Sequence, residues 1–298
     1  MSAITLLDGS IGQEAVKRSG DRATPLWSTS VMLEHPGVIE GIHLDYFNAG
    51  ATIATTNTYA VLPDRLAIIG IEGQLDALLE QALHEAETAR TQFGSGRIAG
   101  SLGPIKASYR SDFEISLKDT KAAYANLITA MNPRVDLYIL ETVSSLHQAE
   151  VTLSATVDCI KPVWLSVSVD DDNGTLLRSG EPLQDLAAII ETHAPQAVLL
   201  NCSRPEAISQ GLPLLKPFGK PFGAYANGFT RISDGFLKDA PTVDALEQRK
   251  DLGPTDYADF VMSWINQGTT IVGGCCEVGP AHITELARRI RAAGHSIT

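Results

Sequence analysis

The chain has 298 residues, and 35 acidic residues against 23 Lys and Arg give it a formal net charge of −12. With 44% hydrophobic and 19% charged residues, the composition excludes a disordered chain, and four cysteines are too few for a disulfide scaffold. The start MSAITLLDGS lacks the features of a secretory signal, and no apolar run reaches the length of a membrane span. The sequence also has no basic stripe of the kind that binds nucleic acid. Taken together, these features lead us to expect a soluble, cytoplasmic protein that acts on small molecules.

Eight short apolar runs alternate with helical segments along the chain. Parallel strands covered on both faces are uniformly apolar, as most of these runs are. The predicted strands are Ile4–Leu7, Thr52–Thr55, Arg97–Gly100, Leu137–Leu140, Val163–Val167, Ala197–Leu200, Phe222–Tyr225 and Thr270–Gly273.

Predicted helices fill the intervals between these strands. One of them starts at Ser116, where Asp119 three residues later indicates a capping box. The predicted helices are His35–Ala49, Pro63–Gln92 with a break near Gly70–Gly73, Ser116–Met131, Ser144–Val157, Leu183–His193, Pro205–Gln210, Thr255–Gln267 and Pro280–Ala293. Eight βα pairs without a dividing linker predict an α/β fold, a (β/α)₈ TIM barrel forming one domain over residues 1–298. The longest irregular stretch, Asn227–Pro254, is interpreted as a lid.

Polar and small residues gather after the predicted strands, where barrels of this kind place their active sites. Three of the four cysteines belong to this set: Cys202 ends strand six, and Cys275 with Cys276 ends strand eight. Strands six and eight are two apart around a barrel, so the three sulfurs can converge. Three thiolates suit Zn²⁺ and leave its fourth position open, as in catalytic zinc sites. The alternatives are a small buried Cys202 and an adjacent pair that forms a disulfide or fills space. Cys159 lies at the opposite end of strand five and is interpreted as structural.

Two acidic residues also follow strands. Glu141 ends an apolar run, where it either binds a substrate cation or pairs with a barrel residue. Asp8 precedes a glycine, so it either contacts substrate or forms an Asx turn or helix cap. The sequence has no G-x-S-x-G, no P-loop and no G-x-G-x-x-G after a strand, which excludes serine hydrolases of that type, nucleotide triphosphatases and Rossmann enzymes.

Together these motifs resemble the homocysteine S-methyltransferase family, the zinc-dependent thiol methyltransferases related to betaine–homocysteine methyltransferase and to the homocysteine-binding module of methionine synthase. The strongest element is Gly273-Gly274-Cys275-Cys276 followed by Gly279-Pro280-Ala281-His282-Ile283, which is similar to the family's G-G-C-C-x-x-x-P-x-H-I signature. Asn201-Cys202 resembles its N-C motif, and Asp8-Gly9-Ser10-Ile11-Gly12 resembles its D-G-x-x-G turn. Leu26-Trp27-Ser28, Asn57-Thr58-Tyr59, Ser101-Leu102-Gly103-Pro104 and Glu141-Thr142 follow in the family's order.

The resemblance implies an enzyme of methionine biosynthesis that moves a methyl group from an onium donor to the thiol of homocysteine. It implies Zn²⁺ bound by Cys202, Cys275 and Cys276, with Glu141 on the homocysteine ammonium. The other substrate-binding candidates are Asp8, Gly9, Ser10 and Asn201 for the amino acid, and Trp27 and Tyr59 for the onium group, since aromatic faces attract methylated cations. Ordinary packing is the alternative for both aromatic residues. Monomers or small homo-oligomers are expected.

Several positions depart from the family pattern. Glu277 and Val278 follow the Cys pair, where Gly and Thr are common; Ile105 and Lys106 replace an aromatic residue and a glycine; and Ala226 stands where proline is usual in the strand-seven motif. These departures lie at the barrel mouth and leave the donor open among S-methylmethionine, S-adenosylmethionine and betaine, with a sulfonium donor favoured. The rivals are a zinc-thiolate enzyme with another thiol or selenol acceptor, a barrel lyase or hydrolase with a structural zinc, and a non-catalytic zinc- or thiol-binding protein.

Overall fold

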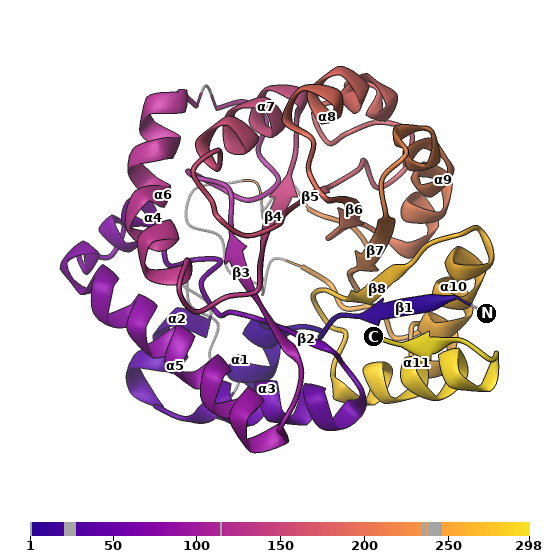
Figure 1. Cartoon of the computed structure of the whole chain (residues 1–298), viewed down its shortest axis with the longest axis horizontal. Helices are drawn as coiled ribbons and strands as arrows, with labels where there is room; N and C mark the ends of the chain where they lie inside the picture. The colour runs from indigo at the N-terminus through magenta and orange to yellow at the C-terminus, as the bar shows by residue number, and fades with distance from the viewer. Residues whose placement is uncertain (1, 21–27, 114, 234–236, 238–245) are drawn as a thin grey trace.

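Eight parallel strands form a ring surrounded by helices (Figure 1). The structure is a computed structural model that describes residues 2–20, 28–113, 115–233, 237 and 246–298. Its strands are β1 (Ala3–Leu6), β2 (Ile53–Thr55), β3 (Arg97–Leu102), β4 (Leu137–Val143), β5 (Val163–Val167), β6 (Ala197–Asn201), β7 (Phe222–Ala226), β8 (Ile271–Gly274) and β9 (Ser296–Ile297). The sheet order is β2-β3-β4-β5-β6-β7-β8-β1-β9.

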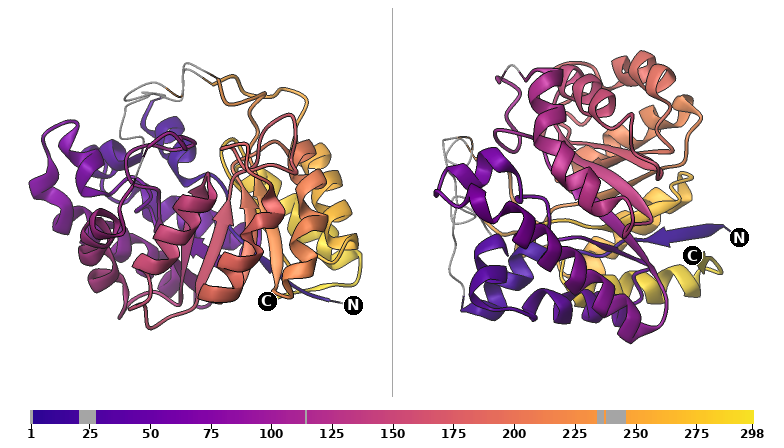
Figure 2. Two further views of the ribbon diagram at one scale, coloured as in Figure 1. Left: turned by 90° about the horizontal axis from the view of Figure 1, so that it is seen from above. Right: turned by 60° about the vertical axis from the view of Figure 1, so that its left-hand side comes forward.

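The ring closes between β1 and β2. Leu7 forms a parallel bridge with Ile53, and the Thr52 amide donates to the Leu6 carbonyl at 2.7 Å. β9 adds to the outer side of β1, so the two termini lie side by side at one end of the barrel (Figure 2). The predicted TIM barrel is therefore confirmed, and each of the eight predicted strands is present.

Helices pack around the outside of the ring. They are α1 (Ile11–Ser19), α2 (Ser28–Glu34), α3 (Val38–Ala49), α4 (Pro63–Ala67), α5 (Leu75–Phe93), α6 (Leu117–Met131), α7 (Leu146–Ala155), α8 (Ala187–His193), α9 (Pro205–Leu215), α10 (Pro254–Asn266) and α11 (Pro280–Ala292), with 3₁₀ turns at Glu72–Gln74, Leu183–Leu186 and Lys216–Phe218. Among the described helices, none combines the length and apolar character needed to cross a bilayer.

Local chemistry explains where several helices begin. Ser116 accepts a hydrogen bond from the Asp119 amide at 3.0 Å, which confirms the predicted cap of α6. The break near Gly70–Gly73 separates α4 from α5 as predicted. Prediction missed α1, α2 and β9; α1 is short and largely polar, so apolar periodicity gives it little signal, whereas Ser10 and Gly20 cap its two ends.

Two apolar layers hold the barrel together. Side chains that alternate inward, such as Ile139, Leu199 and Ile271, fill the interior of the ring. A larger layer packs the outward faces of the strands against the helices. Because the interior is filled, the ends of the strands and their loops are the place for a binding site.

Candidate functional site

A cavity opens where the strands end, and residues from seven of the eight barrel strands or their following loops line it. The set combines two carboxylates, three sulfurs, several hydroxyls and aromatic rings: Leu7, Asp8, Gly9, Ser10, Ile11, Gly12, Gln13, Ser28, Thr55, Thr56, Asn57, Tyr59, Ala60, Ser101, Tyr109, Ile139, Glu141, Thr142, Cys202, Tyr225, Gly274, Cys275 and Cys276. Among these described lining residues there is no Lys, Arg or His. The cavity therefore attracts cations.

The three cysteines predicted to act together do meet at this cavity. The sulfur atoms of Cys202, Cys275 and Cys276 all lie within 4.8 Å of one another. Cys202 and Cys275 are joined as a disulfide, whereas Cys276 is a free thiol with its sulfur 4.0 Å from that of Cys275. The sequence anticipated a bond only between the adjacent pair, and the ring geometry instead brings strand six to strand eight.

Main-chain hydrogen bonds place the three sulfurs. The Cys202 amide donates to the Tyr225 carbonyl at 3.2 Å, and the Cys275 amide donates to the Ala226 carbonyl at 2.9 Å. The end of β7 therefore holds Cys202, which follows β6, and Cys275, which follows β8, on its two sides. Cys202 has a φ of +48°, a left-handed conformation that costs energy in a residue with a Cβ and that recurs at functional sites.

The sulfur cluster fits a soft divalent metal once all three cysteines are thiolates. Three converging sulfurs match the donor set of such ions and leave a fourth position for a ligand from the cavity. Without a cation, burial first and then the nearby Glu277 carboxylate raise the pKa of the Cys276 thiol to about 12. A metal would offset this cost, because a coordinated thiol is deprotonated.

Glu141 occupies the end of β4 inside the cavity. Its carboxylate accepts hydrogen bonds from the Ser101 hydroxyl at 2.5 Å and from the Tyr225 hydroxyl at 3.0 Å. Burial raises the pKa of Glu141, and the two hydroxyls counteract that shift only in part. Both partners are neutral, so the carboxylate has no compensating cation from either of them.

Asp8 ends at the same cavity from the β1 side. Its two carboxylate oxygens accept from the amide and the hydroxyl of Thr55, at 2.6 and 2.9 Å. Burial nevertheless raises the pKa of Asp8 to about 8. A cationic group entering the cavity would favour the ionised form of both carboxyls.

The turn after Asp8 is packed tightly against the β8 loop. A Cβ on Gly9 would lie 2.1 Å from the Val278 carbonyl oxygen, so this position requires glycine. The Ser10 amide donates to the same carbonyl at 3.0 Å, and the Ser10 hydroxyl accepts from the Gln13 amide as the N-cap of α1.

The remaining predicted residues differ in their access to the cavity. Asn201 is buried behind it, and its amide pairs with the amide nitrogen and the hydroxyl of Thr142, each at 3.2 Å. Tyr59 lines the cavity; its hydroxyl bonds Ser108 at 2.6 Å, and the Arg65 guanidinium lies 5.1 Å from its ring centroid. Trp27 lies outside the described residues.

Comparison with known proteins agrees with this geometry. Residues 5–290 match the family described as homocysteine S-methyltransferase. Homocysteine S-methyltransferase of Escherichia coli K12 is 30% identical, with 96% of this chain and 95% of that protein covered. The chain belongs to the homocysteine S-methyltransferase family.

Two other family comparisons concern the metal and the acceptor. The metallated crystal form of the Escherichia coli homocysteine methyltransferase MmuM superposes with a TM-score of 0.80 at 28% identity, covering 97% of this chain and 96% of that one. A selenocysteine methyltransferase of Astragalus bisulcatus is 26% identical, with 98% and 94% covered.

The structure gives a place in the site to residues that the sequence did not put there. The Gln13 side chain hydrogen-bonds Glu277, which the sequence marked only as a departure after the Cys pair. Glu277 has a φ of +64°. Tyr109, at φ +62°, lies in an apolar cluster with Cys202 and Cys276. Glu277 and Tyr109 share a positive φ next to the predicted metal site, which is unusual for a residue other than glycine. Only the three-dimensional structure reveals this feature.

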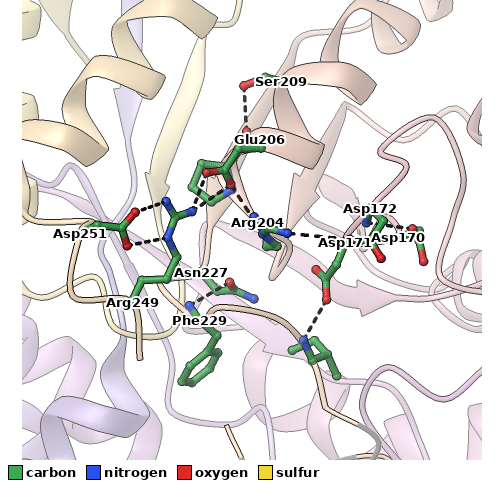
Figure 3. A network of polar contacts seen from close by, with 12 residues as sticks. Asp170, Asp171, Asp172, Arg204, Glu206, Ser209, Asn227, Phe229, Arg249 and Asp251 are labelled. Atoms are coloured by element: carbon green, nitrogen blue, oxygen red, sulfur yellow. Dashed lines mark hydrogen bonds and ion pairs between the residues drawn. The ribbon is translucent and has the colours of Figure 1, made fainter. Parts of the chain in front are cut away.

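The described ends of the 227–254 segment are anchored by a polar network (Figure 3). The Arg249 guanidinium pairs with Glu206 at 2.7 Å and with Asp251 at 2.7 Å. Phe229 bridges Gln248 in antiparallel fashion, so the two ends run side by side. The predicted lid contains residues 234–236 and 238–245, which lie outside the described residues.

Proposed function

We propose that this protein, as one barrel domain over residues 1–298, transfers a methyl group from a sulfonium donor to the thiol of L-homocysteine and so forms methionine. S-Methylmethionine and S-adenosylmethionine are the favoured donors. The convergence of three cysteine sulfurs within 4.8 Å, in a cavity with carboxylates and no lining cation among the described residues, carries the proposal.

Cys202, Cys275 and Cys276 would hold Zn²⁺ in this proposal, with the Cys202–Cys275 pair reduced to two thiolates. When bound there, Zn²⁺ would lower the pKa of the homocysteine thiol, so that the sulfur reacts as a thiolate at neutral pH. The related Escherichia coli structure is a metallated form, which supports a bound metal in this proposal.

The carboxylates would bind the amino acid end of homocysteine. Glu141 presents a buried carboxylate held by two neutral hydroxyls, which suits an ammonium group. Thr55 orients Asp8 at the end of β1, and the Gly9 backbone would approach the substrate carboxylate. Ser10 would shape this turn without binding substrate directly, because its amide and hydroxyl are hydrogen-bonded within the protein. Asn201 lies behind the cavity wall and positions the lining residue Thr142.

The reaction forms one sulfur–carbon bond and breaks another. The thiol proton leaves to solvent, the thiolate sulfur forms a bond to the donor methyl carbon, and the electron pair of the broken bond returns to the donor sulfur. A positive sulfonium and a negative thiolate thus become two neutral thioethers. Because the donor carries positive charge, it favours the ionised form of the cavity carboxyls, and their negative charge in turn attracts it. Tyr59 offers an aromatic surface to the onium group.

The test is methionine formation from homocysteine by reduced, zinc-loaded protein, in parallel with S-methylmethionine, S-adenosylmethionine and betaine. We expect methionine from a sulfonium donor and its loss when zinc is stripped. Turnover with betaine alone would show that the donor is a quaternary amine and not a sulfonium. Binding of zinc and homocysteine without turnover with any donor would instead make the chain a binding protein.

A selenol acceptor is the second candidate. The similarity to a selenocysteine methyltransferase over nearly the whole chain favours it. The same sulfur cluster and carboxylates would serve a selenol, which is more acidic than a thiol and reacts as the selenolate. Comparing homocysteine with selenocysteine at a fixed donor concentration separates the two acceptors by kcat/KM.

We also propose a cytoplasmic location with small-molecule substrates as the partners. Three thiolate ligands require a compartment that keeps cysteines reduced. Fractionation of cells that produce the protein tests this location.

A further inference from the structure

Tyr109 forms part of the cavity wall next to the sulfurs. It belongs to the loop between β3 and α6, is 5% exposed, and packs in an apolar cluster with Cys202, Cys276, Phe229 and Ile232. Its φ of +62° is a left-handed conformation that a bulky side chain rarely adopts. The surrounding structure therefore has to hold this ring in place against a backbone cost.

A buried ion pair supplies that support. The Arg178 guanidinium lies over the Tyr109 ring, 5.1 Å from its centroid. Asp171 binds Arg178 through two contacts of 2.7 and 3.1 Å, and both side chains are less than one tenth exposed. The same Asp171 carboxylate accepts from the Ile232 amide at 2.8 Å. Figure 3 shows Asp171 at the edge of the network that anchors this region.

These contacts join three loops over the sulfurs. Tyr109 follows β3, Asp171 and Arg178 follow β5, and Ile232 follows β7. Arg178 is paired on one side and stacked on the other, so the ring it covers is fixed in orientation. A fixed ring restricts the size of a group that can lie beside the sulfurs.

The position of Tyr109 separates it from the amino acid end of the site. Tyr109 packs in the apolar cluster with Cys202 and Cys276, whereas the Glu141 carboxylate is held by the hydroxyls of Ser101 and Tyr225. Homocysteine placed with its ammonium at Glu141 directs its sulfur toward the cysteines. The methyl donor then has to approach that sulfur on the side away from Glu141, next to the apolar members of the cluster, Tyr109, Phe229 and Ile232.

We propose that Tyr109 is a specificity-determining residue that restricts the methyl donor to a compact sulfonium, and that Arg178 and Asp171 are its positioning residues. This inference rests on the proposed function. The ring leaves room for the small S-methylmethionine and disfavours the bulky adenosyl group of S-adenosylmethionine.

The test compares kcat/KM for the two donors in wild type, Tyr109→Ala and Tyr109→Phe, at saturating homocysteine. We expect Tyr109→Ala to lower the preference for S-methylmethionine over S-adenosylmethionine by about tenfold, the size of effect a reshaped apolar pocket gives. The KM for homocysteine should stay within about twofold of wild type, since its contacts are elsewhere. Tyr109→Phe keeps the ring and should keep the preference.

Arg178→Met tests the positioning role, and Arg134→Met is its matched control. Arg134 pairs with Glu80 and Glu87 on the helical shell, at 2.6 Å each. Both variants lose a guanidinium from an ion pair, but only Arg178→Met should shift the donor preference toward S-adenosylmethionine. If Tyr109→Ala does not fold, Tyr109→Gly replaces it, because glycine adopts a φ of +62° without strain.

The outcomes separate the two claims. Suppose that the wild type makes methionine, but Tyr109→Ala keeps the donor preference or loses kcat/KM equally with both donors. That result would overturn the role of Tyr109 alone. A rise in the KM for homocysteine equal to that for the donor would place Tyr109 in the acceptor site and overturn it too. A wild type without activity toward either sulfonium donor removes the proposed function and this inference together.

Discussion

Gln13 and Glu277 are 264 positions apart, yet the side-chain amide of Gln13 bonds both the carboxylate and the backbone amide of Glu277, each at 2.5 Å. The Gln13 amide oxygen also accepts from the Ser10 hydroxyl at 2.8 Å. The loop that carries the Cys pair is thus joined to the turn that begins α1. This contact holds Glu277 in its left-handed conformation beside Cys276.

Removing either partner should have different effects on stability. Gln13→Ala loses the hydrogen bonds and leaves the strained Glu277 backbone in place, so we expect a loss of about 2 kcal/mol in the free energy of unfolding. Glu277→Gly loses the carboxylate contact but relieves about 1 kcal/mol of left-handed strain, so its stability should stay closer to wild type. Urea unfolding of the metal-free proteins measures both.

The Gln13→Ala variant should also bind metal more weakly, because the loop that carries the Cys pair loses both of its hydrogen bonds to Gln13. We expect an affinity about tenfold lower, in the range found when the groups supporting metal ligands are removed. Lys17→Ala is the control, since Lys17 meets Glu277 at 3.4 Å and is partly exposed. Unchanged zinc affinity in Gln13→Ala would show that the contact contributes to folding only.

Loss of one sulfur ligand should remove most of the metal. Cys275→Ser is expected to bind far less than one zinc per chain and to lose methyl transfer, because a hydroxyl is a poor replacement for a thiolate. Metal analysis of the reduced, dialysed protein measures this. Cys159→Ser is the matched control, since Cys159 is a free cysteine outside the cavity lining. A full zinc complement in Cys275→Ser would be incompatible with the proposed ligand set.

Much of the barrel could be predicted from the sequence, because parallel strands buried on both faces are continuous apolar runs. Val163–Val167 forms β5 with the predicted bounds. Convergence of Cys202 with Cys275 and Cys276 also followed from strand order alone, because the carboxyl ends of the strands meet at one end of the ring.

The rest depended on contacts that sequence order does not reveal. Helix α1 is held by the Ser10 cap and by the Gln13–Glu277 contact, neither of which produces apolar periodicity. Tyr109 lies three residues after Lys106, the last position compared with the family motif, but its place beside Cys276 is fixed by Arg178 from another loop. Such loop-to-loop contacts are set by the three-dimensional structure.

Glu141 should act on the acceptor rather than the donor. Glu141→Gln keeps an acceptor oxygen for one of the two hydroxyls of Ser101 and Tyr225, offers an amide donor to the other, and removes the negative charge that would bind the ammonium. A charged hydrogen bond contributes about 1.5–3 kcal/mol, so the KM for homocysteine should rise by about tenfold to a hundredfold. Initial rates with each substrate varied in turn test this. A similar rise in the KM for the donor would remove Glu141 from the acceptor site.

The stability of the metal-free protein should fall as the pH rises from 6.5 to 8. Burial raises the pKa of Asp8 from 3.8 to about 8, so the folded state binds more protons than the unfolded state between these values. The raised pKa of Glu141 acts in the same direction. Burial lowers the pKa of His43 from 6.5 to about 4 and also lowers the pKa of His282, so both act oppositely, but most of their contribution changes at and below pH 6.5.

The carboxyl groups therefore dominate the slope toward the upper end of the window from pH 6.5 to 8. A single group changes stability by at most about 1.4 kcal/mol per pH unit, so Asp8 accounts for at most about 2 kcal/mol here. Asp8→Asn should flatten the pH dependence, because an amide does not titrate and still accepts from the Thr55 amide. Thermal unfolding at closely spaced pH values measures the slope, and an equal slope in wild type and Asp8→Asn would show that Asp8 is already ionised in the folded protein.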